Sequence, residues 1–385
     1  MKIYLKDNVY DAAIERINWL FDEFEDVVVS FSGGKDSTVA LNLTLQVAEE
    51  RGRLPIKVLF LDQEAEWQMV RDYIRRVMDD PRVDPVWLQV PIRLFNATAP
   101  DEPWLKCWDP EKADEWMREK EPDSVHENTF GTETFGDMFA AWAKHEFGTD
   151  PACFVAGVRT EESPARFVGL TANATYKGRT WGKKLNAKGP QVTMYPLYDW
   201  SYTDVWKAIH DNGWDYCPVY DLMFQHGVKT GQMRVSNLHH ETAVNTLYFL
   251  QEVEPDTWAK LTKRLRGIAT VGQMKSEAFA VPKRLPNMFR DWPEYRDHLV
   301  ENLISDPENR EKFRAHFEKM DELYSDMPGN ERLYRAQINT VLANDFHFTK
   351  LDTLERSADY NIFRRVKRGE TINAAERAKF GRLLK

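Results

Sequence analysis

The chain of 385 residues has few cysteines and no segment suited to a membrane, and each absence narrows its possible functions. Its three cysteines, Cys107, Cys153 and Cys217, stand far apart without paired spacing, which disfavours a disulfide scaffold or a zinc site. The first residues lack an apolar signal core, and no apolar run approaches the length that spans a bilayer. We therefore expect a cytoplasmic protein with no membrane partner, in a reducing compartment.

The chain also lacks an overall positive charge. It has 52 basic and 61 acidic residues, a formal net charge of −9, so no global bias indicates nucleic-acid binding. A local basic surface remains possible, and residues 176–188 are the main candidate, because they contain five cations, two aromatic residues and no acid. This segment could contact a nucleic acid, form a mobile lid over a nucleotide, or simply be solvated.

The most informative motif is SFSGGKDS at residues 30–37. It follows a short apolar strand and opens a helix-like segment, so its glycines let the backbone approach a ligand and the helix start offers N–H groups. The adjacent glycines and the Lys-Asp-Ser order differ from the Walker pattern. We expect this loop to hold a phosphate chain through Ser32, Gly33, Gly34, Lys35, Asp36 and Ser37.

Apolar periodicity predicts an α/β fold with a mostly parallel sheet flanked by helices. We expect the first domain to cover residues 1–240, with an irregular insertion or lid at 96–133, and a mainly helical region to cover 241–385. The predicted strands lie at 27–30, 56–61, 86–90, 153–158 and 192–195, and the predicted helices at 8–24, 35–51, 65–79, 135–147 and 202–212.

A second polar cluster follows the predicted strand 153–158, at the sheet edge where the glycine loop also lies. Two arginines and a serine at a strand end can clamp phosphate or sulfate oxygens, although a salt-bridged helix start would have the same pattern. Asp62 ends strand 56–61 at that edge, and the main chain after this strand is expected to hold an adenine ring. The candidate ligands of the second cluster are Gly157, Arg159, Glu162, Ser163 and Arg166.

These motifs resemble a known family. The loop is similar to the PP-loop of N-type ATP pyrophosphatases, and GVRTEESPAR at 157–166 with PLYDWSYTDVW at 196–206 resembles the phosphoadenylyl-sulfate reductase and ATP sulfurylase small-subunit family. Residues 220–223, 232–235 and 254–261 resemble its IbrA-like branch, whose members often occur beside a ParB-like partner. The resemblance implies a HUP-like (adenine nucleotide alpha hydrolase) fold and an adenine nucleotide, such as ATP with Mg²⁺, as cofactor.

By this resemblance the protein cleaves ATP between the α- and β-phosphates and adenylates a substrate, releasing pyrophosphate, in sulfur transfer or nucleic-acid modification. Lys35, Asp36, Arg159 and Arg166 are then the catalytic candidates, and Asp36 is the candidate to face the Mg²⁺. A true reductase is disfavoured, because the chain has no cysteine beyond Cys217 and no cysteine pairs for an iron–sulfur cluster. The alternative is a nucleotide-sensing co-regulator that acts with a ParB-like or DNA partner.

Overall fold

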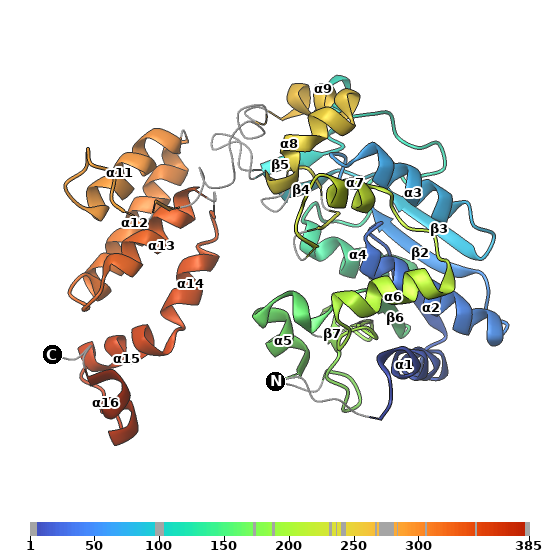
Figure 1. The fold of residues 1–385 in the computed structure, drawn as a ribbon, viewed down its shortest axis with the longest axis horizontal. Coiled ribbons are helices and arrows are strands. Elements are labelled where there is room, and N and C mark those ends of the chain that lie inside the picture. The colour runs from blue at the N-terminus through green and yellow to red at the C-terminus, as the bar shows by residue number, and fades with distance from the viewer. Residues whose placement is uncertain are drawn as a thin grey trace. The chain divides into compact units, whose positions relative to one another are not determined.

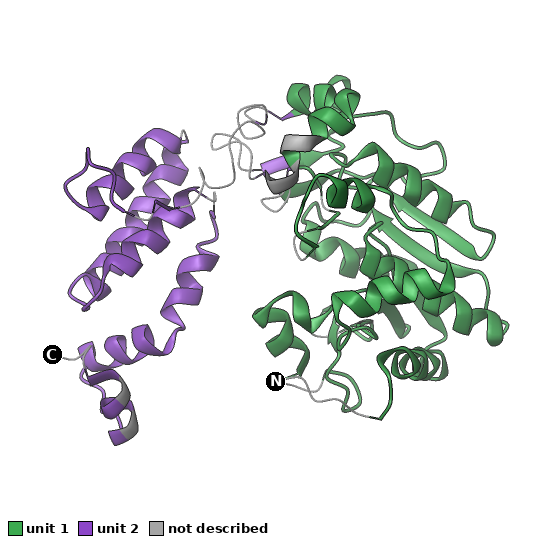
Figure 2. Cartoon of the chain, viewed as in Figure 1, with its two compact units in different colours: residues 1–94, 106–238, 246–264 green, residues 95–105, 239–245, 265–385 purple. Residues whose placement is uncertain are grey.

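The computed structural model describes most of the chain as two compact units, which Figure 2 draws in green and purple. Unit 1 comprises residues 1–94, 106–238 and 246–264, and unit 2 comprises 95–105, 239–245 and 265–385. The division at residue 240 that the sequence suggests stays a prediction. The structure describes residues 6–96, 104–171, 175–186, 189–230, 233–235, 237–239, 244–265, 268, 281–282, 284–304, 306–342 and 345–381.

Unit 1 is built on a central sheet with the strand order β3-β2-β1-β6-β8-β7. All neighbouring strands are parallel except β7 and β8, which pair antiparallel at one edge. Helices flank this sheet (Figure 1), so the predicted α/β class with a mostly parallel sheet is confirmed. The strands are β1 (Asp26–Ser30), β2 (Ile56–Leu61), β3 (Val83–Leu88), β6 (Ala152–Val155), β7 (Gly182–Lys184) and β8 (Val192–Met194).

Several strands differ from the sequence prediction: β6 ends at Val155 rather than at residue 158, and pairing at the sheet edges explains the differences at β3 and β7. β3 starts at Val83 and includes Pro85. Proline has no N–H to donate, and an edge strand such as β3 tolerates this because one of its sides has no neighbouring strand. β7 lies inside the segment expected to be a flexible basic loop, and it forms because Lys183 pairs with Thr193 of β8. The sequence argument predicted β8 but did not recognise residues 182–184 as its neighbouring strand.

The helices of unit 1 begin and end where local signals are strong. Helix α6 has a capping box, in which Ser201 accepts from the Asp204 N–H and the Asp204 carboxylate accepts from the Ser201 N–H. Helix α4 packs on β6 through Trp142 and Phe154, whose rings meet edge to face at 5.8 Å. The helices are α1 (Val9–Glu23), α2 (Lys35–Glu50), α3 (Gln68–Met78), α4 (Phe135–Phe147), α5 (Pro164–Thr171), α6 (Tyr202–Asn212), α7 (Val219–Gln225) and α9 (Pro255–Arg264).

The segment predicted as an irregular insertion contains some regular structure. Residues 97–103 of this stretch lie outside the described residues, while β4 (Ile92–Phe95) pairs with β5 (Trp104–Cys107) in a separate two-stranded sheet. Short 3₁₀ turns occur at η1 (Pro110–Glu115) and at η2 (Thr160–Glu162). Whether 96–133 acts as a lid stays a prediction.

Unit 2 is helical around an apolar core. Phe313, Phe317 and Tyr324 are buried on one face of α12, where they pack against aromatic and aliphatic side chains of the neighbouring helices. None of the helices in the described ranges is long and apolar enough to cross a membrane. The helices of unit 2 are α11 (Trp292–Leu303), α12 (Pro307–Tyr324), α13 (Glu331–Leu342), α14 (Thr349–Glu355), α15 (Ala358–Lys367) and α16 (Ala374–Phe380), while α8 (Val244–Val253) lies mostly in unit 1.

Candidate functional site

The glycine loop joins the end of β1 to the start of α2. Gly33 has a φ of +71°, a conformation that favours glycine, and a Cβ built on it would lie 3.1 Å from Val70. Gly34 is the N-cap of α2 and has no side chain to bond to the helix N–H groups. The first turn of α2 therefore presents main-chain donors and the positive end of the helix dipole at the carboxyl edge of the sheet.

Two serines hold the loop in this shape. The hydroxyls of Ser32 and Ser37 lie 3.1 Å apart, and the Ser37 hydroxyl donates to the Gly34 carbonyl at 2.9 Å. The Ser32 N–H donates to the Ser37 Oγ at 3.3 Å. Because these bonds form within the loop, its backbone is already ordered before any ligand arrives, which lowers the entropic cost of binding.

Tyr220 supports the loop from helix α7. Its hydroxyl accepts a hydrogen bond from the Lys35 main-chain N–H at 3.1 Å, and the Lys35 Nζ lies 5.6 Å from its ring centroid. Burial raises the pKa of Tyr220 well above the ordinary tyrosine value, so the hydroxyl stays neutral. The sequence argument used residues 220–223 only as a family likeness and missed this contact.

The four catalytic candidates come together in one chain of ion pairs. The Lys35 Nζ lies 2.8 Å from a carboxylate oxygen of Asp36, and the other Asp36 oxygen pairs with Arg159. Arg159, which is only 4% exposed, also lies 3.9 Å from Glu162, and Glu162 pairs with Arg166. The two arginines therefore converge on one carboxylate, the geometry that the sequence predicted for a shared anion.

Gly157 allows the loop after β6 to pack directly on the glycine loop. A Cβ at this position would lie 2.5 Å from the carbonyl carbon and oxygen of Asp36 and 2.7 Å from the Ser37 nitrogen, closer than real contacts permit. Ser163 has a local role, because its hydroxyl accepts from the Arg166 N–H at 3.2 Å. Any side chain at 157 would push apart the two segments that carry the catalytic candidates.

A polar cavity of about 120 Å³ lies beside Lys35 and Arg159. Arg234, which the sequence argument did not select, adds a cation to its wall. The pKa of Arg166 is lowered mainly by burial and next by repulsion from Arg234, so these guanidinium groups lie near one another. The cavity is lined by Lys35, Arg159, Glu161, Glu162, Tyr202, Thr230, Met233 and Arg234.

A second cavity, of about 230 Å³, adjoins the loop at Phe31 and Ser32 and is mostly aromatic and apolar. It reaches the end of β2, where the sequence predicted contacts to a ring system. Most ligand pockets in proteins combine such apolar walls with a few polar groups. Its lining residues are Phe31, Ser32, Phe60, Leu61, Gln63, Glu66, Trp67, Val70, Phe135, Phe139, Val235 and Asn237.

Asp62 lines neither of these two cavities, and its expected role as a nucleotide ligand stays a prediction. Its carboxylate is fully buried and accepts hydrogen bonds from Trp87 and Gln89, each at 2.9 Å. The Arg118 guanidinium donates to both of its oxygens, at 2.8 and 2.7 Å. Because so many donors occupy the carboxylate, Asp62 fixes the segment that follows β2.

Glu64 forms a second buried ion pair in the same segment. Its two oxygens accept from Arg264 of α9, at 2.6 and 3.1 Å, and from the main-chain N–H groups of Trp108 and Met117. Both charged side chains are buried, and Glu64 has a positive φ of 65°. This pair joins three distant parts of unit 1.

The cysteines are not suited to nucleophilic chemistry. All three are buried and free, and burial raises the pKa of each thiol above its ordinary value, to about 12 for Cys217. A thiol nucleophile reacts as the thiolate, which these environments disfavour near neutral pH. The Cys107 thiol donates to the Gln63 carbonyl at 3.1 Å and so has a structural role.

The segment 176–188 is more ordered than a free basic loop. Lys177 pairs with Glu23, the Arg179 guanidinium lies 5.0 Å from the Trp19 ring centroid, and Trp181 is buried against the same ring. These contacts remove the aromatic ring of Trp181 from stacking with bases. Lys183 remains exposed, as does Lys184, while Lys188 lies outside the described residues.

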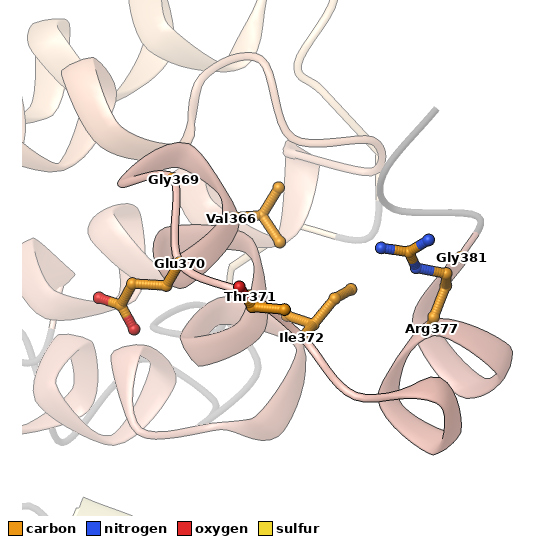
Figure 3. Close-up of a pocket in the computed structure, with 7 residues that line it drawn as sticks. All are labelled: Val366, Gly369, Glu370, Thr371, Ile372, Arg377 and Gly381. Carbon is orange, nitrogen blue, oxygen red and sulfur yellow. The ribbon is translucent and has the colours of Figure 1, made fainter.

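Unit 2 has a hollow of about 490 Å³ formed by α15, α16 and the turn between them (Figure 3). It contains none of the candidate residues, and its wall combines small, apolar and oppositely charged groups without a cluster of catalytic type. Its lining residues are Val366, Gly369, Glu370, Thr371, Ile372, Arg377 and Gly381.

Within the described ranges, no three His, Cys, Asp or Glu side chains gather into a metal-binding group. Magnesium bound to a nucleotide needs fewer protein ligands, since phosphate and water oxygens complete its shell. Asp36 fits that requirement, because it supplies one carboxylate beside the start of α2.

Comparison with known proteins finds a family domain in the first part of the chain. Residues 26–226 match the phosphoadenosine phosphosulfate reductase domain, and residues 227–379 match a domain of unknown function, DUF3440. The chain belongs to the phosphoadenosine phosphosulfate reductase domain family. The glycine loop, the second polar cluster and both cavities lie largely within the part that this family covers, so the site belongs to a nucleotide-binding domain of that family.

Three relatives illustrate the range of the family. The uncharacterized protein YbdN of Escherichia coli K12 is 30% identical over 320 residues, covering 78% of this chain and 77% of its own. An adenosine 5′-phosphosulfate reductase of Lysinibacillus sphaericus is 24% identical, covering 56% and 77%. Subunit 2 of the sulfate adenylyltransferase of Vibrio atlanticus is 22% identical, covering 51% of this chain and 61% of the relative, less than two thirds of its length.

Proposed function

We propose that this protein binds ATP and cleaves it between the α- and β-phosphates, transferring adenylate to an acceptor and releasing pyrophosphate. The observation that carries the proposal is the glycine loop with an aromatic cavity at Ser32 and a polar cavity at Lys35, whose wall holds three cations and two carboxylates. An adenine ring fits the first kind of environment, and charged oxygens fit the second. Members of the family include a sulfate adenylyltransferase subunit, which supports adenylyl transfer as the reaction class.

In this proposal, the N–H groups at the start of α2 and the Lys35 ammonium bind the β- and γ-phosphates. Arg159 and Arg166 stabilise the charge that develops around the α-phosphorus, because both guanidinium groups already converge on the Glu162 carboxylate. Asp36 would hold Mg²⁺, and the bound ion would neutralise phosphate charge.

The reaction is an in-line displacement. An oxygen of the acceptor attacks the α-phosphorus while the bond to the oxygen bridging the α- and β-phosphates breaks, and that oxygen leaves with pyrophosphate. The polar cavity of about 120 Å³ favours an acceptor with an anionic group. Sulfur transfer and nucleic-acid modification are the processes in which such an adenylated product would be used. The buried cysteines argue against reduction of a sulfonucleotide.

Pyrophosphate release from purified protein with ATP and Mg²⁺ tests the proposal, with sulfate and oligonucleotides as acceptors. We expect release of pyrophosphate that depends on an acceptor and on Lys35. Release of inorganic phosphate instead would exclude attack at the α-phosphorus. Absence of calorimetric ATP binding would exclude the proposal as a whole.

The second candidate is a nucleotide-sensing co-regulator that acts with a ParB-like or DNA partner. It is favoured by the charge pairing of the site, because Lys35, Arg159 and Arg166 are each already bound to a carboxylate. A polyanion must rearrange these pairs when it binds, and such a rearrangement can serve as a signal. Binding of ATP without pyrophosphate release, together with ATP-dependent retention of a ParB-like protein, would favour this function.

A further inference from the structure

Arg234 differs from the other cations of the polar cavity, because no carboxylate neutralises it. Lys35 and Arg159 are buried, and both pair with Asp36. The Arg234 side chain lines the same cavity but is exposed, and the described residues offer it no hydrogen bond or ion pair. A guanidinium group carries five N–H donors in a planar fork, so Arg234 presents unused donors where a ligand can reach them.

The rest of the site is balanced in charge. Three cations pair there with three carboxylates, which leaves the charge of Arg234 uncompensated. Arg234 repels Arg166 and is, after burial, the next cause that lowers the pKa of that guanidinium. An anion bound at Arg234 relieves this repulsion and breaks none of the existing pairs. The paired groups are Lys35, Asp36, Arg159, Glu161, Glu162 and Arg166.

The segment that carries Arg234 is bound to the nucleotide site by its main chain. Val235 lines the aromatic cavity, and its main chain hydrogen-bonds to the Tyr220 hydroxyl that also supports the glycine loop. The Leu238 N–H donates to the Ala65 carbonyl at 2.7 Å. The segment lies outside the phosphoadenosine phosphosulfate reductase match and within the DUF3440 match, so the domain of unknown function supplies this cation to the site.

We propose that Arg234 binds a tetrahedral oxyanion of the acceptor, a sulfate or a phosphate group, beside the α-phosphate of ATP. This inference rests on the proposed adenylyl transfer and names the residue that binds its acceptor. The planar fork of a guanidinium matches two oxygens of such an anion. In the proposed reaction the phosphates of ATP occupy Lys35 and the start of α2, so Arg234 remains available to a second anion. The oxyanion then shares a cavity with Arg159, where the α-phosphorus is attacked.

Calorimetry on the full chain, saturated with the α,β-methylene analogue of ATP, tests this inference with sulfate and a single-stranded oligonucleotide as probes. The parent protein should bind one probe, which tells whether the oxyanion is a free sulfate or a nucleic-acid phosphate. Arg234→Ala should bind that probe about 10- to 100-fold more weakly, because charge-assisted hydrogen bonds are lost. Arg234→Lys keeps the charge without the fork and should lie between the two.

The matched control is Lys229→Ala, at a nearby exposed cation that lines neither cavity. It removes the same charge from the chain and should bind both the analogue and the probe as the parent protein does. Arg234→Ala should bind the analogue alone with unchanged affinity. An equal loss of affinity for the analogue would instead make Arg234 a nucleotide ligand and overturn the inference, as would a matching loss of probe affinity in Lys229→Ala.

Pyrophosphate release with the bound probe as acceptor completes the test. Arg234→Ala should raise the KM for the acceptor about 10- to 100-fold and leave the KM for ATP unchanged. Binding of neither probe by the parent protein, or unchanged binding in Arg234→Ala, would overturn the inference. If a probe binds through Arg234 but no pyrophosphate is released, the proposed reaction is wrong and the oxyanion site stands.

Discussion

The two units differ in where their charged side chains lie. In unit 1 the buried charged residues include Lys35 and Arg159 of the site, Asp62 and Glu64 of the segment that follows β2, and Arg264 of α9, which pairs with Glu64. In unit 2 the core is aromatic and aliphatic, and one buried cation, Arg296, is paired with Asp321 at 2.6 Å.

Buried charges are costly to desolvate, and removing one partner leaves the other uncompensated. Their concentration in unit 1 is therefore better explained by chemistry than by stability, since functional sites gather charges in low-dielectric surroundings. Unit 2 follows the ordinary pattern of an apolar core with charges at the surface. Substitutions in the two units should therefore have different effects. Those in unit 1 should lower activity, and those in unit 2 should lower stability alone.

The largest effect is expected at Lys35. Lys35→Met keeps the length of the side chain but removes the ammonium group at the loop, and we expect the rate of pyrophosphate release to fall about 100- to 1,000-fold. Lys207→Met, on the exposed face of α6, is the control and should keep the parent rate. An unchanged rate in Lys35→Met would move the active site elsewhere.

Phe317→Ala in unit 2 should affect stability without affecting the site. Phe317 is 2% exposed and its ring packs edge to face against Phe313 at 5.7 Å, so truncation should cost about 3–5 kcal/mol. Hydrogen exchange of α12 and α13 amides measures the loss, and calorimetry should find the nucleotide affinity unchanged. Met288→Ala, at a residue that is 81% exposed, should leave both quantities as they are.

Gly157→Ala should weaken unit 1 by overpacking. The new Cβ must move the main chain at Asp36, which should cost about 1–3 kcal/mol and lower nucleotide affinity at the same time. Gly169→Ala is the control, because a Cβ there meets nothing within 4 Å and alanine favours the α5 helix. Unfolding in urea and calorimetry should show both losses in the first variant and neither in the second.

The last expected effect is gradual, because it depends on pH through Glu66. Its pKa is raised to about 8 in the folded protein from 4.5, so between these values the folded chain holds a proton that the unfolded chain has lost. Stability of unit 1 should therefore fall as pH rises through this window, by at most about 1.4 kcal/mol per pH unit. Hydrogen exchange of β1 and β2 amides should show this slope in the parent protein and a flatter one in Glu66→Gln. Equal slopes would mean that Glu66 is ionised in the fold.

Local patterns predicted the parts of the fold that local chemistry determines. Strand 56–61 is buried at every position except Lys57, and helix 202–212 has a complete capping box at Ser201, so both were predicted with their observed bounds. β7 forms because it pairs with β8 a few residues further along the chain, which its short polar sequence does not indicate, and α3 starts only at Gln68, after Glu64 has turned the chain with a positive φ.

The same distinction applies to the site. The glycine loop and the 157–166 cluster are continuous motifs, and the sequence argument selected them with the residues that the structure brings together. Tyr220 reaches the loop across 185 positions, and Arg234 matters because of the cavity it lines. The position of Asp62 at a strand end suggested a ligand, but no local pattern indicated the donors with which tertiary packing surrounds its carboxylate.

The bond between Glu64 and Arg264 has a practical consequence for dividing the protein. A fragment that ends near residue 240 would contain the whole glycine loop yet lack the guanidinium that neutralises Glu64. That carboxylate would be left without its counter-charge, at a cost of about 3–5 kcal/mol. Shortened versions intended for crystallisation or binding studies should therefore extend at least through helix α9.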